Sequence, residues 1–302
     1  VVGGTLLQHV DQPLEAFRSH ELLTFDPWAV QQLTARSARA TYALVREGER
    51  WTLVEPLTDV ADHAQVSATL SKFRALRIER VIAESPGAPG QSAWGFETPF
   101  ATVTIGTGED TSALELVVGS PTSDAAEQWY AKRSDEPAIY AVAGDTIESL
   151  LQDAQTLRAR TCFDFFASQA IKLRVAGADR DWTLEQHDGQ WRRTGDEQLL
   201  ESSAVEAFVW KLRDLTLLRF VEDVPSDLAR FGLEPPQGTV QVWVEGVNIP
   251  QELLVGEALP EATTRYGRIA GRASIVELPE TITEILATTP EAFTPAPAAS
   301  PQ

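Results

Sequence analysis

The sequence predicts an α+β protein built from two tandem copies of one antiparallel-sheet domain, each with a long helix and a short closing helix. The first observation is an internal repeat. The run Gly95-Phe-Glu-Thr-Pro, followed later by Leu-Val-Val-Gly119, returns as Gly232-Leu-Glu-Pro-Pro with Leu-Leu-Val-Gly256. The shift is the same at both ends, 232 − 95 = 137 and 256 − 119 = 137. The second observation is that strand-like alternating segments outnumber helical ones and do not alternate with them, which excludes a β-α-β architecture.

The composition limits the classes of partner and site. The 302 residues, 43% of them hydrophobic, suffice for two domains of ordinary size. The net charge of −19 argues against a nucleic-acid partner, because phosphate binding depends on clustered Lys and Arg. The single cysteine, Cys162, permits no internal disulfide, and its apolar neighbours predict a buried side chain rather than a nucleophile. No apolar window is long enough for a membrane-spanning helix.

Four regions are expected along the chain. Residues 1–20 show no sustained period and are predicted to be a tether. Because the chain starts at Val1 and holds no methionine, we expect this tether to follow a removed membrane anchor, with an ordinary loose terminus as the alternative. Residues 21–158 are the first copy and residues 159–289 the second. Residues 290–302 are a Pro/Ala-rich tail.

Each copy is expected to open with a short helical turn or a strand and to continue with a hairpin. At the opening, Phe25-Asp26 matches Phe163-Asp164 at a shift of 138. In the second hairpin, Asp188-Gly189 between two strand-like runs favours a tight turn. The paired aromatic positions, Tyr42 with Trp182 and Trp51 with Trp191, lie at a shift of 140. We expect these aromatics to pack on one face of each hairpin.

A long helix follows each hairpin. Apolar residues recur at helical spacing from about residue 62 to residue 76 and from about residue 202 to residue 215. Acidic residues before the first helix, and Ser202 or Ser203 in the second, are predicted to cap the helix starts. Short strands beginning at Arg80 and Arg219 lead out of the helices.

The rest of each copy is an antiparallel meander. Alternating strands are predicted over residues 101–105, 114–118, 128–132 and 138–142 in the first copy. The second copy repeats them over residues 239–244, 252–255, 264–268 and 274–278. Short helices over residues 146–151 and 281–286 close the copies.

One cluster could hold a metal ion or a catalytic centre. Asp59, Asp62 and His63 lie close together in the sequence. The competing interpretation is that the acidic residues cap the helix that starts there, where carboxylates also suit the helix dipole. The second copy has Leu-Glu-Ser-Ser at this place, without the histidine, which favours capping. The sequence therefore predicts no catalytic residue, no cofactor site and no metal site.

Tryptophans are the candidate contact residues. Trp51, Trp182 and Trp191 are explained by hairpin packing. The remaining candidates for anchoring a partner at the surface are Trp94, Trp129, Trp210 and Trp243.

The pattern resembles a bacterial family known as DUF4340, a domain of unknown function. The resemblance covers about residues 21–290. It is carried by Trp51 before Glu-Pro and Ala61-Asp62, by the Gly-Phe-Glu-x-Pro turn at Gly95, by Leu-Val-Val-Gly119, by Tyr140 before the closing helix, and by the Leu157-Arg-Ala-Arg junction. The second copy departs from the pattern, because Arg-Arg-Thr-Gly follows Trp191 and Val276 replaces Tyr140.

The resemblance implies a location and a kind of partner. Family members carry one N-terminal membrane helix, face the extracytoplasmic side, and often accompany ABC-transporter or gliding-motility components. We therefore expect a non-enzymatic binding or scaffold subunit of a membrane protein complex, anchored at the periplasmic face of the bacterial inner membrane. The first alternative is an extracytoplasmic glycan-binding protein that uses the groove between the copies. The second is an enzyme with a site at Asp59, Asp62 and His63.

Overall fold

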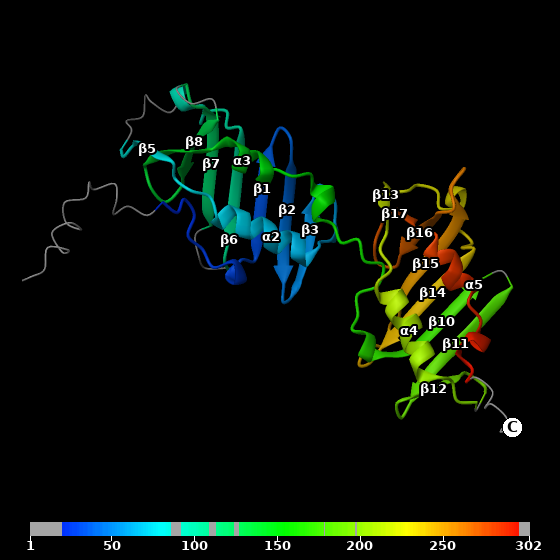
Figure 1. The fold of residues 1–302 in the computed structure, drawn as a ribbon. Coiled ribbons are helices and arrows are strands. Elements are labelled where there is room, and N and C mark those ends of the chain that lie inside the picture. The colour runs from blue at the N-terminus through cyan, green and yellow to red at the C-terminus, as the bar shows by residue number, and fades with distance from the viewer. Residues whose placement is uncertain are drawn as a thin grey trace, which may run out of the picture. The chain divides into compact units, whose positions relative to one another are not determined.

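The protein consists of two compact units, residues 1–159 and 160–302, in the computed structural model. The structure describes residues 20–85, 92–108, 113–123, 127–177, 179–196 and 198–295. All but residue 20 of the predicted tether, and residues 296–302 of the predicted tail, lie outside these ranges. Both units are antiparallel sheets with helices on one face, so the fold is α+β with two sheet bodies (Figure 1).

The first unit contains a nine-stranded sheet. In sheet order its strands are β4 (Asp59–Val60), β3 (Arg50–Glu55), β2 (Thr41–Glu47), β1 (Gln32–Ser37), β6 (Ala101–Gly106), β7 (Leu114–Pro121), β8 (Gln128–Arg133), β9 (Ile139–Ala143) and β5 (Arg80–Ala83). Helices α2 (His63–Arg74) and α3 (Gly144–Leu150) cover one face (Figure 1).

The second unit repeats this plan in eight strands. In sheet order they are β12 (Gln190–Arg193), β11 (Arg180–His187), β10 (Ala170–Gly177), β14 (Gly238–Val244), β15 (Gln251–Ala258), β16 (Arg265–Ile269), β17 (Ile275–Leu278) and β13 (Arg219–Glu222). Its helices are α4 (Ser202–Arg213) and α5 (Thr281–Ala287). The predicted hairpins, meanders and helices are confirmed, with shifts of a few residues at their ends.

The long helix crosses its sheet from one edge to the other. In the first unit α2 follows the edge strand β4 and leads to β5, which lies at the opposite edge beside β9. The second unit does the same with α4, β12 and β13. One apolar face of each helix therefore covers the middle of the sheet (Figure 1), and buried residues such as Val66, Leu70 and Phe73 form this face in α2.

The two cores are separate. Alternate residues of the strands are buried, as in β14, where every second residue from Gly238 to Val244 is buried. Cross-strand pairs stack these residues, and Leu33, Leu44 and Leu53 lie opposite one another on neighbouring strands. One apolar cluster contains only residues between Leu22 and Leu157, and the other only residues between Cys162 and Phe293. Each copy thus has its own hydrophobic core.

The repeated glycine motif is a close backbone crossing. Gly95 and Gly232 adopt φ values of +79° and +65°, a left-handed conformation that glycine adopts without strain. A Cβ atom on Gly119 would lie 2.0 Å from the carbonyl oxygen of Trp94, and one on Gly256 would lie 2.1 Å from that of Phe231. The constant shift of 137 therefore marks the place where a strand passes against the preceding turn in both copies.

The opening of each copy corrects one predicted match. Both suggested elements are present, a 3-10 turn (Pro27–Ala29 or Ala167–Gln169) followed by a central strand. Ala29 N–H donates to the Asp26 carbonyl, and Gln169 N–H donates to the Phe166 carbonyl. Asp26 therefore matches Phe166, so the shift here is 140 and the predicted shift of 138 was wrong. The two Phe-Asp dipeptides are alike in composition but occupy different places before the turn.

Helix capping differs between the copies. The Asp62 carboxylate accepts from the Gln65 N–H at 3.0 Å, so the predicted acidic cap is confirmed in the first copy. The predicted serine cap in the second copy was wrong, because α4 starts at Ser202 and its cap residue, Glu201, makes no capping bond. The chain is still extended at Glu201, whose N–H donates to the Phe293 carbonyl at 2.7 Å, which fixes the helix start there.

A substitution pair tests this difference. We expect Asp62→Ala to lower the free energy of unfolding by about 1 kcal/mol, the usual cost of losing an N-cap. Glu201→Ala, at the matching position of α4, should change it by less than about 0.5 kcal/mol. Urea unfolding of both full-length variants, followed by tryptophan fluorescence, measures the two values. Equal losses would contradict the assignment of the cap.

The packed part of the second copy runs on to Phe293. The 3-10 turn Pro290–Phe293 follows α5, and the buried Phe293 ring lies 5.8 Å from Trp182 and 5.5 Å from Phe208, between ring centroids. These three rings pack the apolar face of α4 against the β11–β12 hairpin.

Candidate functional site

The first copy has a pocket of about 620 Å³ at the β5–β9 edge of its sheet. This volume lies in the range of small-molecule sites. Its apolar lining consists of Ile78, Val81, Ala138 and Tyr140. Its ionisable lining consists of Glu21, Glu79, Glu84, Glu136, Arg80, Arg133 and His20. We call this cavity the Tyr140 pocket.

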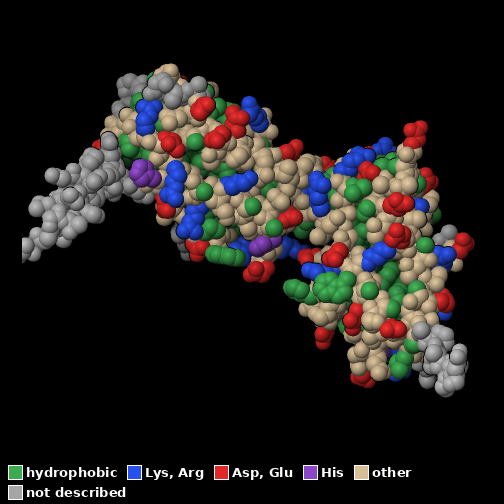
Figure 2. Space-filling view, in the orientation of Figure 1, with side chains coloured by type: hydrophobic (Ala, Val, Ile, Leu, Met, Phe, Trp, Pro, Cys, Tyr) green, Lys and Arg blue, Asp and Glu red, His purple; other side chains and the backbone are tan. Residues whose placement is uncertain are grey.

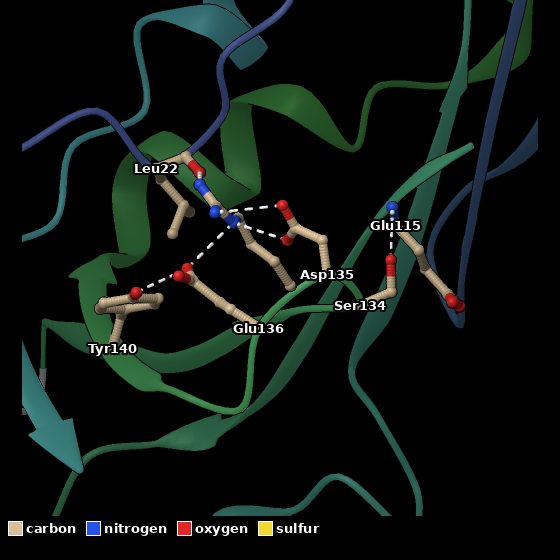
Figure 3. A network of polar contacts seen from close by, with 7 residues as sticks. Leu22, Glu115, Ser134, Asp135, Glu136 and Tyr140 are labelled. Carbon is tan, nitrogen blue, oxygen red and sulfur yellow. Dashed lines mark hydrogen bonds and ion pairs between the residues drawn. The ribbon is translucent and has the colours of Figure 1, made fainter. Parts of the chain in front are cut away.

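Arg133, the last residue of β8, lines the Tyr140 pocket. Its guanidinium donates to both carboxylate oxygens of Asp135, at 2.9 and 3.2 Å. It also donates to the Leu22 carbonyl at 3.0 Å and lies 3.0 Å from Glu136 Oε1. Figure 3 shows Asp135, Glu136 and the Leu22 carbonyl arranged around this guanidinium. The arrangement joins the start of the first copy to the β8–β9 turn, across 111 residues of sequence.

Tyr140 holds Glu136 in place from β9. Its hydroxyl donates to Glu136 Oε1 at 2.5 Å (Figure 3). Burial, and next the bond to Glu136, raise the pKa of Tyr140 to about 12. The hydroxyl therefore remains a donor at physiological pH. Because the contacts of Arg133 and Tyr140 both fall on Oε1, Oε2 is left to accept from a group in the pocket.

The second copy does not repeat this network. Strand register pairs Leu116 with Arg133 in the first copy and Leu253 with Ile269 in the second, so Ile269 takes the place of Arg133. Likewise Ala131 pairs with Tyr140, whereas Gly267 pairs with Val276. The replacement of Tyr140 by Val276, noted in the sequence, therefore removes one side of a polar network.

The second copy instead presents an aromatic surface beside α4. Phe166 is 70% exposed and Trp210 is 49% exposed. Trp210 lines a pocket of about 280 Å³ together with Ala167, which follows Phe166 in the chain, Val209 and the buried Trp191. Figure 2 shows hydrophobic side chains gathered on this part of the second copy. We call Phe166, Trp210 and this pocket the Trp210 surface.

The four candidate contact tryptophans differ in environment. Trp210 is the one of the four with a largely exposed ring. Trp129 is half-buried, packs against the first core and stacks on Phe100 with centroids 4.2 Å apart. Trp94 is half-buried with its ring 6.4 Å from that of Tyr130, and Trp243 lies under Lys172 Nζ, 5.1 Å from the ring centroid.

Two exposed aromatics were missed by the sequence analysis. Trp28 is 76% exposed in the 3-10 turn before β1, and Phe166 precedes the equivalent turn before β10. The signal in the sequence was their place at the turn that opens each copy, since turns lie at the surface. The apolar residues around them made both positions resemble core positions.

Asp59, Asp62 and His63 do not converge. Asp62 caps α2. Asp59 forms a buried ion pair with Arg158, with Oδ2 2.7 Å from Nε and both side chains almost fully buried. No group of three or more metal-ligating side chains occurs among the described residues.

Other single candidates have structural surroundings. Cys162 is buried, and burial raises the pKa of its thiol to about 12, which keeps it protonated. His187 lies exposed at the hairpin turn, 3.5 Å from Glu185. Trp51, Trp182 and Trp191 are buried in their cores, as predicted.

The chain matches the family model "Domain of unknown function (DUF4340)" over residues 1–92, 51–202 and 191–295. It belongs to the DUF4340 family. The overlapping matches extend through both sheet bodies, in keeping with the internal repeat. No curated protein and no solved structure matches the chain. Within the described part of this DUF4340 protein, no helix is long and apolar enough to cross a membrane.

Proposed function

We propose that this DUF4340 protein is a non-enzymatic binding or scaffold subunit of a membrane protein complex. An anchor preceding Val1 holds it at the periplasmic face of the bacterial inner membrane. The anchor, the location and the ABC-transporter or gliding-type setting rest on the family resemblance. The binding role rests on the Trp210 surface.

The observation that supports binding is the exposure of a large aromatic side chain at a pocket, with a second one close to it in the chain. Trp210 is 49% exposed and lines a cavity of about 280 Å³, and the 70% exposed Phe166 precedes the lining residue Ala167. Trp is enriched among the residues that dominate binding energy at protein interfaces, where it lies close to pockets filled by the partner. Glu206 and Gln186 at the pocket provide polar groups for a rim.

The partner that fits is a protein segment with an apolar side chain and a neutral or basic flank. The pocket has room for one side chain rather than for a large ligand. The protein carries a net charge of −19, which repels acidic partners.

The test is purification in gentle detergent from salt-washed native membranes, followed by mass spectrometry. We expect a partner at a fixed ratio, and expect Trp210→Ala and Phe166→Ala to lower its recovery about tenfold or more, as loss of a central aromatic does. Val224→Ala is the matched control, because Val224 is an exposed apolar residue of the same copy outside this surface. Release of the protein by salt alone, or equal recovery with all three variants, would contradict the proposal.

A further inference from the structure

The Tyr140 pocket carries an excess of negative charge. Its lining includes four carboxylates, Glu21, Glu79, Glu84 and Glu136, against two guanidiniums. Both guanidiniums have partners in the protein. Arg133 is bound by Asp135, Glu136 and the Leu22 carbonyl, and Arg80 donates to Gln128 Oε1 at 3.3 Å. An anionic ligand would therefore have to displace existing contacts. Of the carboxylates, Glu21 is paired with Arg77 at 3.6 Å, but a cationic ligand can bind Glu79 and Glu136 Oε2 without displacing a contact.

Two carboxylates can accept from a bound cation. Glu136 offers Oε2, since its two contacts fall on Oε1. Glu79 also lines the pocket and, within the described part of the chain, forms no ion pair and accepts no side-chain hydrogen bond. Ile78, Val81, Ala138 and the Tyr140 ring provide apolar surface between the charged groups. This combination suits a positive group on an alkyl chain.

The second copy shows what this corner of the fold accommodates. The β8–β9 and β16–β17 hairpins have the same length, so Arg272 occupies the position of Glu136. Arg272 is only 8% exposed, and its guanidinium carbon lies 5.4 Å from the centroid of the Phe220 ring. Phe220 takes the place of Val81, because Phe220 pairs with Val276 as Val81 pairs with Tyr140.

Arg272 also lies near the start of its copy, close enough to Cys162 for its charge to act on the thiol. Cys162 is the counterpart of Leu22, since Cys162 N–H donates to the Leu215 carbonyl as Leu22 N–H donates to that of Leu76. The second copy thus places the Arg272 guanidinium in this corner, over the Phe220 ring. In the first copy the guanidinium beside Leu22 is that of Arg133, and the position of Arg272 holds the Glu136 carboxylate, which lines an open cavity.

We propose that the Tyr140 pocket binds a guanidinium or ammonium group carried on an alkyl chain, with Glu136 and Glu79 as its acceptors. The group comes either from a free organic cation or from an Arg or Lys side chain of a partner protein. Both sources share the same chemistry. This inference does not depend on the proposed function, because it concerns the other copy and a different surface.

The test is isothermal titration of the full chain with butylguanidine, an alkyl guanidinium with no other charged group. Butylurea, its neutral urea analogue, is the ligand control. We expect butylguanidine to bind about tenfold more tightly than butylurea or better, because hydrogen bonds between charged partners are the stronger ones. A capped Gly-Arg-Gly peptide separates the two sources. Binding of butylguanidine itself indicates a free cation, and binding of the peptide alone indicates a partner's side chain.

Three charge-neutralising variants locate the site. Glu136→Gln and Glu79→Gln should each weaken binding of the positive probe about tenfold. Glu79→Gln breaks no ion pair among the described residues, so its result does not depend on the Arg133 network. Glu245→Gln, at an exposed position of the second copy, removes the same charge elsewhere and should have no effect. The proposal would be overturned if neither positive probe bound, if the urea analogue bound with equal affinity, or if Glu245→Gln caused an equal loss.

Discussion

Alanine at Gly119 is expected to lower the stability of the first copy by about 3 kcal/mol or more, beyond the usual cost of overpacking. The reason is the crossing with the preceding turn. The new Cβ would lie 2.0 Å from the Trp94 carbonyl oxygen and 3.0 Å from the Phe96 ring. The nearest atom belongs to the backbone and cannot rotate away, so either β7 or the turn must move.

The same substitution at Gly256 should destabilise the second copy, because its Cβ would lie 2.1 Å from the Phe231 carbonyl oxygen. Each apolar core is confined to its own copy. Hydrogen exchange of the full chain should therefore show faster exchange within residues 20–159 for Gly119→Ala and within residues 160–295 for Gly256→Ala.

Two other strand glycines are matched controls. A Cβ on Gly106 would come no closer than 3.4 Å to another atom, and one on Gly177 no closer than 3.8 Å. Gly106→Ala and Gly177→Ala should change the free energy of unfolding by less than about 1 kcal/mol, because the site has room for the methyl group. Urea unfolding measures all four variants. Similar midpoints for Gly119→Ala and Gly106→Ala would contradict the close crossing.

The repeat and the strand pattern were enough to predict the fold class. Alternation and turn residues are local signals, so the hairpins, meanders and helices could be located from short windows. The constant shift of 137 was informative because a backbone crossing tolerates only glycine at Gly119 and Gly256. The match at Phe25-Asp26 failed because no backbone geometry requires a Phe-Asp dipeptide at one fixed place before the turn.

The sites could not be predicted in the same way, because they depend on residues distant in sequence. The Tyr140 pocket exists because β5 lies beside β9, and nothing near Arg80 in the sequence indicates that neighbour. Arg133 meets Leu22 across 111 residues. The sequence did show that Val276 replaces Tyr140. Only the structure shows that this replacement removes a hydrogen bond to the position of Glu136.

The buried pair of Asp59 and Arg158 is another long-range contact that the sequence concealed. It joins residues 99 positions apart, at the edge strand β4 and just before the chain enters the second copy. Asp59 also accepts from the Val60 N–H at 2.8 Å, and Arg158 donates to Gln155 at 2.7 Å. Read locally, Asp59 suggested a metal ligand. The structure shows instead a carboxylate held by a guanidinium.

Removal of one partner of this pair should be costly. We expect Asp59→Ala to lower the free energy of unfolding of the first copy by about 3–5 kcal/mol, because it leaves the buried Arg158 guanidinium without its carboxylate. The double variant Asp59→Leu/Arg158→Leu should lose less than Asp59→Ala, since removing both charges removes their desolvation cost as well. Glu148→Ala is the control, because Glu148 pairs with Arg39 at an exposed site, where an ion pair contributes about 1 kcal/mol or less. Urea unfolding of the full chain compares the three. If Asp59→Ala lost no more than Glu148→Ala, the pair would not stabilise the first copy, and the closure of β4 onto residue 158 would have to depend on the backbone bridge between Ala61 and Arg158.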